Sequence, residues 1–337
     1  MRIGLIGLGR IGAFHANTLV GIPAIDSLVV TDAVPANTKH VVDRHQHEGV
    51  EGVDSVAALL ASGVDGVIIA SGTNTHADLI LACVEAGLPT LCEKPVAQTG
   101  AAGAELLRRL NGSTVPVQMG FQRRYDAAIA GARAAVVSGE LGWITTIRST
   151  TLDPAPPPAE YIAVSGGMFR DCGVHDFDVL RWVTGQEAVE VYATGSNRGA
   201  EFFRRCDDVD TSAAIVTFAD GALGLVSNTR YNARGYDVRL EVHGSKDSVA
   251  AGVDDRWPMR ATEPGVTFPA GPPHRFFMDR FQAAFRAEFE TFLDVAAGNQ
   301  PSPCTVADGL EADWIAEACA RSVREHRPVR IDEVRLT

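Results

Sequence analysis

Short apolar segments alternate with longer amphipathic ones in the first third of the chain. The apolar runs are residues 2–6, 28–31, 66–70, 89–92 and 115–119. Short runs of this kind are typical of parallel strands that are buried on both faces. Residues 76–87 and 99–110 lie between such runs and repeat apolar side chains with the period of a helix. The alternation predicts right-handed βαβ units and a doubly wound parallel sheet.

The pattern changes near residue 143, where apolar and polar positions begin to alternate. The alternating runs are residues 143–150, 188–194, 211–218, 222–229 and 237–243. A period of two predicts antiparallel strands, and Ala219-Asp220-Gly221 is typical of a hairpin turn. Helical patterns cover residues 171–184, 276–297 and 305–326. The sequence therefore predicts an α/β protein whose second part holds a large open, mostly antiparallel sheet.

Composition narrows the classes of protein that remain possible. Of the 337 residues, 46% are hydrophobic and 21% are charged, which is typical of a globular chain and not of a disordered one. No segment has the ~18 consecutive apolar residues that a membrane helix needs. A net charge of −12 without a block of like charges makes nucleic acids and anionic membranes poor partners. The first residues do not form a secretion signal, so we expect a cytoplasmic protein with six reduced cysteines.

A glycine-rich loop follows the first predicted strand. It consists of Gly7, Leu8, Gly9, Arg10, Ile11 and Gly12, and a helical pattern begins directly afterwards. Such a loop lets backbone N–H groups and the positive end of a helix dipole approach the phosphates of a dinucleotide. Asp32 lies at the end of the second predicted strand, where its carboxylate can bind both ribose hydroxyls and repel a 2′-phosphate. These features predict a Rossmann-type domain that binds NAD in preference to NADP.

Two further polar clusters follow predicted strands of this first part. Ser71, Thr73, Asn74 and His76 belong to a cluster after the third apolar run, and ligands of open α/β sheets bind at such strand ends. A helix cap followed by a surface histidine is the structural alternative for this cluster. Glu93-Lys94-Pro95 follows the fourth run, in a chain with only three lysines. A functional lysine near the nicotinamide is our interpretation, and a lysine that merely reaches solvent is the alternative.

A third candidate cluster lies in the second part of the chain. Asp171, His175 and Asp178 are spaced so that one face of a helix would carry all three side chains. Histidine titrates near neutral pH and suits the removal of a proton from an alcohol, so a catalytic helix is one interpretation. A solvated polar stripe is the other. The spacing could also suit a metal, but no thiolates accompany it, and we predict no metal.

These segments together resemble the Gfo/Idh/MocA oxidoreductases, and in particular their inositol 2-dehydrogenase branch. The similarity extends over nearly the whole chain, through the glycine loop, residues 71–95, residues 120–126 and residues 165–182. Members of this family have a Rossmann domain followed by an α/β domain with a large open sheet. The resemblance implies an NAD-binding domain over residues 1–122 and a domain for substrate binding and oligomerisation over residues 123–337. The last helix, 305–326, can pack back on the first domain.

The resemblance also implies roles for individual residues. Lys94 would bind the reacting oxygen, His175 would be the general base, and Asp171 would bond within that catalytic group. The substrate, a polyol or sugar, would lie near Arg124, Asp153, Tyr161, Asp178 and Tyr236. The NAD site would be lined by Gly7, Gly9, Arg10, Ile11, Gly12, Asp32, Ser71, Thr73, Asn74, His76, Glu93, Lys94 and Gln122. The implied activity is oxidation of a secondary hydroxyl of a cyclitol, most specifically myo- or scyllo-inositol.

One segment departs from the pattern of that branch. Several inositol dehydrogenases have a His-Arg-Asn-Pro segment where this chain has Thr151-Leu152-Asp153-Pro154, so the substrate stays open. The alternatives are a dehydrogenase of another sugar or an aminocyclitol precursor, a glycosidase that retains NAD, and a non-catalytic NAD sensor.

The strands of the second part leave partly apolar residues on both faces, while few helices are available to cover them. We therefore predict a homodimer or homotetramer that pairs through the open sheet.

Overall fold

The computed structural model describes residues 1–335. The chain forms two compact units, the first made of residues 1–122 and 283–310 and the second of residues 123–282 with the described residues from 311 onward. The first segment of the first unit ends at Gln122. Residues 283–310 belong to the first unit, although the sequence prediction placed them with the second part.

The first unit is built on a six-stranded parallel sheet with the order β3-β2-β1-β4-β5-β6. Its strands are β1 (Arg2–Ile6), β2 (Ser27–Thr31), β3 (Val50–Gly52), β4 (Gly66–Ile69), β5 (Thr90–Glu93) and β6 (Val117–Gly120). This confirms the predicted doubly wound sheet. Only the short β3 has no counterpart in the prediction, because its two exposed residues, Glu51 and Gly52, leave no apolar run to recognise.

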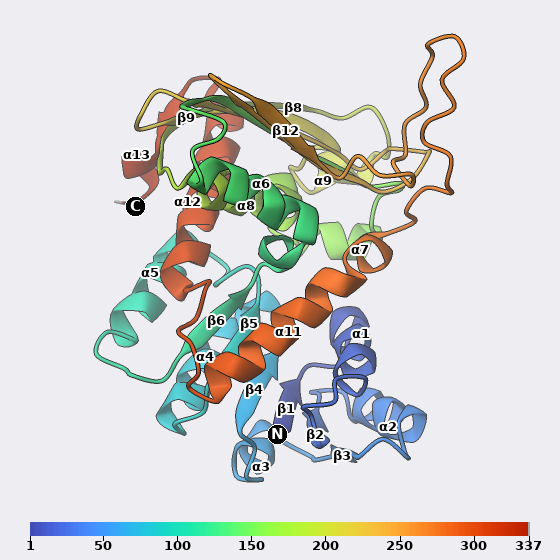
Figure 1. Cartoon of the computed structure of the whole chain (residues 1–337). Coiled ribbons are helices and arrows are strands. Elements are labelled where there is room, and N and C mark those ends of the chain that lie inside the picture. Colours follow the sequence, from blue (N-terminus) through green and yellow to red (C-terminus); the bar gives the residue numbers. More distant parts are fainter. Residues whose placement is uncertain (336–337) are drawn as a thin grey trace. The chain divides into compact units, whose positions relative to one another are not determined.

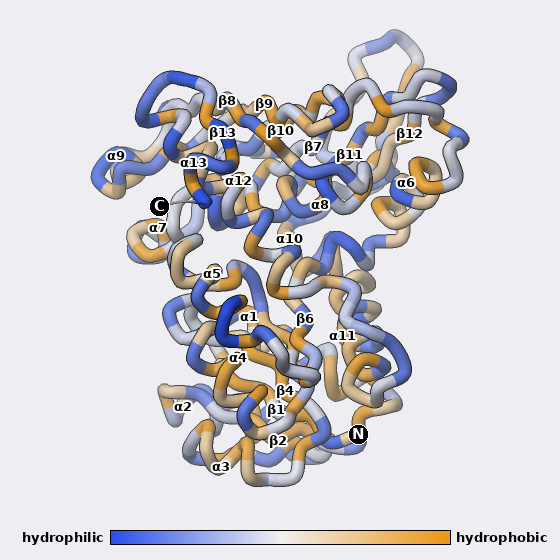
Figure 2. Tube along the Cα trace, turned by 90° about the vertical axis from the view of Figure 1, so that its left-hand side faces the viewer, coloured by the Kyte–Doolittle hydropathy of each residue, from blue (hydrophilic) through white to orange (hydrophobic). Residues whose placement is uncertain are grey.

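Helices cover the first sheet, whose central strands are hydrophobic along their length (Figures 1 and 2). They are α1 (Arg10–Leu19), α2 (Pro35–Arg44), α3 (Val56–Leu60), α4 (His76–Glu85), α5 (Gly100–Arg109) and α11 (Gln282–Ala296). Phe292 of α11 lies against Gly66 at the start of β4, so this late helix fills the core of the first unit.

The second unit is built on a seven-stranded sheet with the order β12-β11-β7-β10-β9-β8-β13. Its strands are β7 (Ile144–Leu152), β8 (Ala188–Ser196), β9 (Thr211–Phe218), β10 (Leu223–Thr229), β11 (Asp237–Gly244), β12 (Ser248–Ala251) and β13 (Val329–Arg330). Only β7 and β10 pair in parallel, and the other neighbours are antiparallel. The predicted large, mostly antiparallel sheet is therefore confirmed.

The main helices of the second unit lie on one face of this sheet (Figure 1). They are α6 (Ala127–Val137), α8 (Val174–Thr184), α12 (Val306–Glu325) and α13 (Ile331–Arg335). Leu180 of α8 packs closely on Gly224 of β10, and Ser322 of α12 accepts a hydrogen bond from the Ala193 backbone of β8. Short helices α7 (Ala159–Ile162), α9 (Phe202–Arg205) and α10 (Phe277–Arg280) lie in the connections.

The helix α12 belongs to both units. Gly309, in its first turns, lies against Val96 and Met119 of the first unit, whereas the turns from Glu311 onward belong to the second. Among the helices within residues 1–335, none is long and apolar enough to cross a membrane.

Candidate active site

The glycine loop of the first unit has the geometry of a phosphate cradle. Gly7 has φ +91, and a Cβ there would lie 2.5 Å from the Ser71 nitrogen. A Cβ on Gly12 would lie 1.9 Å from the Gly7 carbonyl oxygen, so only glycine lets α1 begin this close to β1. Gly9, by contrast, faces open space at its Cβ position. The loop thus presents backbone and the start of α1 where a dinucleotide phosphate can approach.

Asp32, directly after β2, is fixed against this loop. Its Oδ2 accepts a hydrogen bond from the Leu8 backbone at 2.6 Å, and its Oδ1 accepts from the Val34 backbone at 2.7 Å. Asn37 donates to the same Oδ1 at 3.2 Å. The carboxylate therefore has a defined orientation next to the phosphate cradle, which places a negative charge where the ribose of a dinucleotide would lie.

The polar cluster after β4 forms a tight turn. The Ser71 and Thr75 hydroxyls lie 2.7 Å apart, and Thr75 also donates to the Gly72 carbonyl. His76 is buried: its Nδ1 lies 2.8 Å from the Pro95 carbonyl oxygen and its Nε2 lies 3.2 Å from that of Ser71. Burial lowers the pKa of His76, against the effect of the two carbonyl groups. The alternative of a surface histidine is therefore wrong, and the ring ties this turn to the segment after β5.

That segment, Glu93-Lys94-Pro95, begins at the last residue of β5. The Glu93 carboxylate is buried and lies 2.6 Å from Nε2 of His15, which belongs to α1. Lys94 is half-buried and follows the strand directly, as the sequence predicted. Glu93 was expected to line the cofactor site, but its Oε1 is engaged by His15.

In the second unit, the predicted helix 171–184 starts with a wider turn. Residues Phe169–Gly173 form a π-helix, and the regular α8 begins at Val174. His175 is half-buried, whereas Asp178 is fully buried. The polar residues of this helix thus have different environments, and the alternative of a solvated polar stripe is wrong.

Asp178 binds Arg124 through both carboxylate oxygens. Nη2 of Arg124 donates to Oδ1 at 2.5 Å and its Nε donates to Oδ2 at 2.9 Å. The guanidinium also lies over the ring of Trp182, 5.9 Å from the ring centroid. A bidentate pair of this kind fixes the orientation of both side chains. Arg124 and Asp178, both predicted near the substrate, therefore bind each other.

A second buried arginine connects three more of the predicted residues. Arg230, just after β10, donates from Nη1 to Asp153 at 2.6 Å and from Nη2 to Asp171 at 2.7 Å. Tyr161 donates to the other oxygen of Asp171 at 2.7 Å. Burial raises the pKa of Asp153, although Arg230 opposes the shift. Arg230 escaped the sequence analysis because no motif distinguishes it from the other arginines of the chain.

Asp176, next to His175, is the other important residue that the sequence analysis missed. It is fully buried and accepts hydrogen bonds from Arg123 at 2.8 Å and from Asn228 at 2.8 Å. The hydroxyls of Ser149 and Thr151 donate to it as well, at 2.6 and 2.7 Å. This network attaches the first turn of α8 to β7 and β10. A second carboxylate beside the histidine was its only sequence signal.

Tyr236 and Gln122 are also buried. The Tyr236 ring lies near Phe276 and Phe281, and burial raises its pKa. Gln122 begins the short helical turn Gln122–Tyr125. Across residues 1–335 there is no cluster of His, Cys, Asp or Glu side chains able to hold a metal ion.

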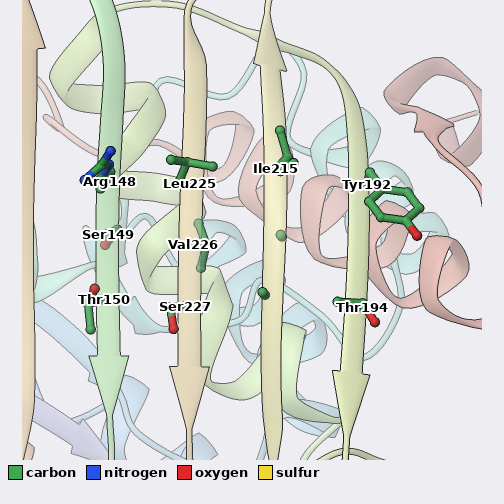
Figure 3. Close-up of a pocket in the computed structure, with 11 residues that line it drawn as sticks. Arg148, Ser149, Thr150, Tyr192, Thr194, Ile215, Leu225, Val226 and Ser227 are labelled. Atoms are coloured by element: carbon green, nitrogen blue, oxygen red, sulfur yellow. The ribbon is translucent and has the colours of Figure 1, made fainter.

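A pocket of about 350 Å³ lies away from these residues, on the face of the second sheet opposite its helices. Figure 3 shows Arg148, Leu225, Ile215 and Tyr192 in one row across four neighbouring strands. Ile215 and Tyr192 are 43% and 44% exposed, which is high for large apolar side chains in the middle of a sheet.

Two family models match the chain. The model described as "Oxidoreductase family, NAD-binding Rossmann fold" matches residues 1–121, and "GFO/IDH/MocA C-terminal domain" matches residues 129–250. A myo-inositol 2-dehydrogenase of Thermotoga maritima is 35% identical over 99% of each chain. A scyllo-inositol 2-dehydrogenase (NAD(+)) of Bacillus subtilis is 30% identical over 98% of this chain and 96% of its own. The crystal structure of a scyllo-inositol dehydrogenase from Lactobacillus casei, with bound NAD(H) and scyllo-inositol, superimposes with a TM-score of 0.88 at 29% identity and covers 98% of this chain and 99% of its own.

Proposed function

Because this chain belongs to the Gfo/Idh/MocA family of NAD-binding oxidoreductases, we propose that its reaction is the reversible oxidation of a secondary hydroxyl of a cyclitol, most specifically inositol, to the ketone. The observation that carries the proposal is similarity over the full chain to proteins named for myo- and scyllo-inositol oxidation. The fold alone would not select this substrate, since one fold supports many reactions.

The residues assigned to the cofactor all belong to the first unit, and they fit NAD. The glycine loop would hold the pyrophosphate with Arg10 and Ile11 at the start of α1, and Asp32 would bind the adenosine ribose. We assign the remaining cofactor contacts to Thr73, Asn74 and Gln122. We assign a structural role to His76, which binds the Pro95 carbonyl, and to Glu93, which binds His15. NAD, when bound, supplies the hydride acceptor.

The protein's own part in the reaction is to position the carbinol and move its proton. We assign the general base to His175, which is half-buried at the start of α8. A neutral imidazole can accept the proton of a hydroxyl group. Lys94 stabilises the negative charge that develops on the oxygen. Asp171, held by Arg230 and Tyr161, is assigned to the same group.

The residues assigned to the substrate all belong to the second unit and include several paired polar groups. The 37% exposed Tyr161 and the partly exposed Asp171 are suited to bind hydroxyl groups of a polyol. Asp153, Asp178 and Tyr236 are buried, so we assign them to holding Arg230, Arg124 and the loop around them. Asp153 replaces the asparagine expected by resemblance, and its charge lies beside Arg230.

A direct assay tests this function. The purified protein is mixed with NAD⁺ and, separately, with myo-inositol, scyllo-inositol and a set of aldoses, and NADH is followed by absorbance. We expect net NADH with at least one inositol, at a higher kcat/KM than with any aldose. Preference for an aldose would contradict the cyclitol assignment. No net NADH with any polyol, together with glycoside cleavage, would point to a glycosidase that retains NAD.

We also propose that the open face of the second sheet binds the same face of a second copy. The face combines exposed apolar side chains, among them Tyr192, Ile215 and Leu223, with charges of both signs such as Arg148 and Glu241. A two-fold axis brings identical patches together, so a patch with both signs can be complementary to itself. Pairing of two such dimers through another surface would give a tetramer.

Light scattering at micromolar concentration tests the assembly, because one chain has a mass of 35.8 kDa. We expect a mass of two or four chains, and a smaller one for Ile215→Asp, which places a charge in the centre of the apolar row. Thr184→Asp, on α8 away from this face, is the control. A monomeric mass for the unmodified protein would contradict the proposal.

A further inference from the structure

A buried histidine of α1 contacts the segment that carries Lys94. His15 has no exposed surface, and its Nε2 lies 2.6 Å from Oε1 of Glu93. Its ring packs edge-on against Phe289, with centroids 4.9 Å apart, and lies 5.3 Å from the ring of Phe285. Within residues 1–335 its Nδ1 has no hydrogen-bond partner. The contact with Glu93 is therefore the polar interaction that this packed ring makes.

The two residues that flank Lys94 are both bonded to buried histidines. Glu93 on one side binds His15 of α1, and the carbonyl of Pro95 on the other side binds His76 of α4. Lys94 itself is half-buried between these two anchored residues. The backbone at the lysine is thus fixed from two directions by helices that flank the cofactor loops.

Packing alone does not account for Glu93. A buried carboxylate is costly unless it is paired and hydrogen-bonded, and an apolar side chain would fill the same space without that cost. Its partner lies on α1, the helix whose first residues follow Gly9 of the phosphate cradle. The pair therefore connects α1, which would hold the cofactor, with Glu93, the residue directly before Lys94.

We infer that His15 and Glu93 are a positioning pair: they fix the place of the Lys94 ammonium and tie it to the helix of the glycine loop. The inference rests on the proposed function for the role of Lys94. Neither residue of the pair needs to touch the substrate. Because small displacements of an aligned group reduce rates steeply, the pair should affect the rate of hydride transfer more than cofactor binding.

Two substitutions of His15 separate the hydrogen bond from packing. His15→Phe keeps an aromatic ring against Phe285 and Phe289 but removes the donor, and His15→Gln keeps a donor. We expect kcat of His15→Phe to fall ~10-fold or more, with the dissociation constant of NAD changed less than about three-fold. The primary deuterium isotope effect on kcat should rise, since hydride transfer becomes slower. His15→Gln should recover most of kcat.

Glu48→Gln is the matched control. Glu48 contacts His45 in the same unit, so this variant also alters a histidine–carboxylate pair, but outside the proposed site. It should leave kcat and the isotope effect unchanged. If His15→Phe changes kcat only as much as the control, or lowers it with an unchanged isotope effect, the positioning role is wrong.

A readout without substrate keeps the inference testable if no polyol is oxidised. The chain has only three lysines, Lys39, Lys94 and Lys246. Reductive ¹³C-methylation therefore gives three lysine signals by NMR, beside the signal of the Met1 amine. We expect the Lys94 signal of His15→Phe to be displaced toward that of the exposed Lys39, with the other two signals unchanged. The same Lys94 signal, or the same lack of one, in unmodified protein and His15→Phe would overturn the inference, whatever the substrate proves to be.

Discussion

Apart from the buried His15–Glu93 pair, the candidate site residues of the first unit present mainly backbone groups and side chains at strand ends, whereas those of the second unit form arginine–carboxylate pairs. In the first unit, Gly7, Gly9 and Gly12 shape a cradle that needs no side chain. In the second, Arg124 and Arg230 are buried and bind three carboxylates. A backbone cradle depends on local conformation, while buried pairs depend on residues far apart in the chain. The two units should therefore respond differently to substitution.

The largest effect is expected from removing the arginine of the second unit. Arg230→Met leaves the buried Asp153 and the partly exposed Asp171 without their common partner. Loss of one member of a buried pair typically costs ~3–5 kcal/mol. Chemical denaturation should show that the free energy of unfolding falls by about this amount. Arg204→Met is the control, since Arg204 is exposed on α9 and should change the free energy of unfolding by less than about 0.5 kcal/mol. Equal effects of the two variants would show that Arg230 is not an organising residue.

Substitution of the proposed base should change activity instead of stability. His175→Ala is expected to lower kcat by ~10²-fold or more, because general-base catalysis typically contributes that much. The dissociation constant of NAD, measured by fluorescence, should stay within about three-fold, since the glycine loop belongs to the other unit. A decrease in kcat of less than three-fold would contradict the assignment of His175.

In the first unit, substitution of Asp32 should change the selectivity between NAD⁺ and NADP⁺ with little loss of stability. Asp32→Asn removes the charge but keeps an oxygen for the Leu8 or Val34 backbone. We expect the ratio of kcat/KM for NAD⁺ to that for NADP⁺ to fall ~10-fold, because the repulsion of a 2′-phosphate is lost. Equal kcat/KM values for the two cofactors in the unmodified protein would show that Asp32 does not select NAD.

The same contrast explains which features could be predicted from the sequence. The glycine loop, Asp32 and the Lys94 segment follow strands directly, so their positions follow from local pattern and sheet topology. Arg230 and Asp176 are recognisable only through partners that lie 25 to 77 residues away in the chain. The wider turn at Phe169–Gly173 also has no periodic signal. Local periodicity identifies elements, but it does not reveal which buried charges meet.

The smallest effect on stability is expected from substitution of Asp153, because burial raises the pKa of this carboxyl while pairing with Arg230 lowers it. Burial raises the pKa of this carboxyl above its ordinary value of 3.8, despite Arg230. The folded state therefore binds the proton more tightly than the unfolded state, and this contribution to stability is complete below pH 3.8 and is lost as pH rises through the raised value. Asp153→Asn removes the ionisable group and keeps an oxygen for Arg230.

The free energy of unfolding of Asp153→Asn should thus decline less than that of the unmodified protein from about pH 4 toward neutral pH. Asp208 and Asp237 also have raised pKa values and contribute similar slopes, but they are present in both proteins and cancel in the difference. Asp43→Asn, at an exposed pair with Lys39, controls for the loss of one charge. A steeper decline in Asp153→Asn than in the unmodified protein would mean that the attraction of Arg230 outweighs burial, so that this pair stabilises the second unit through its charge.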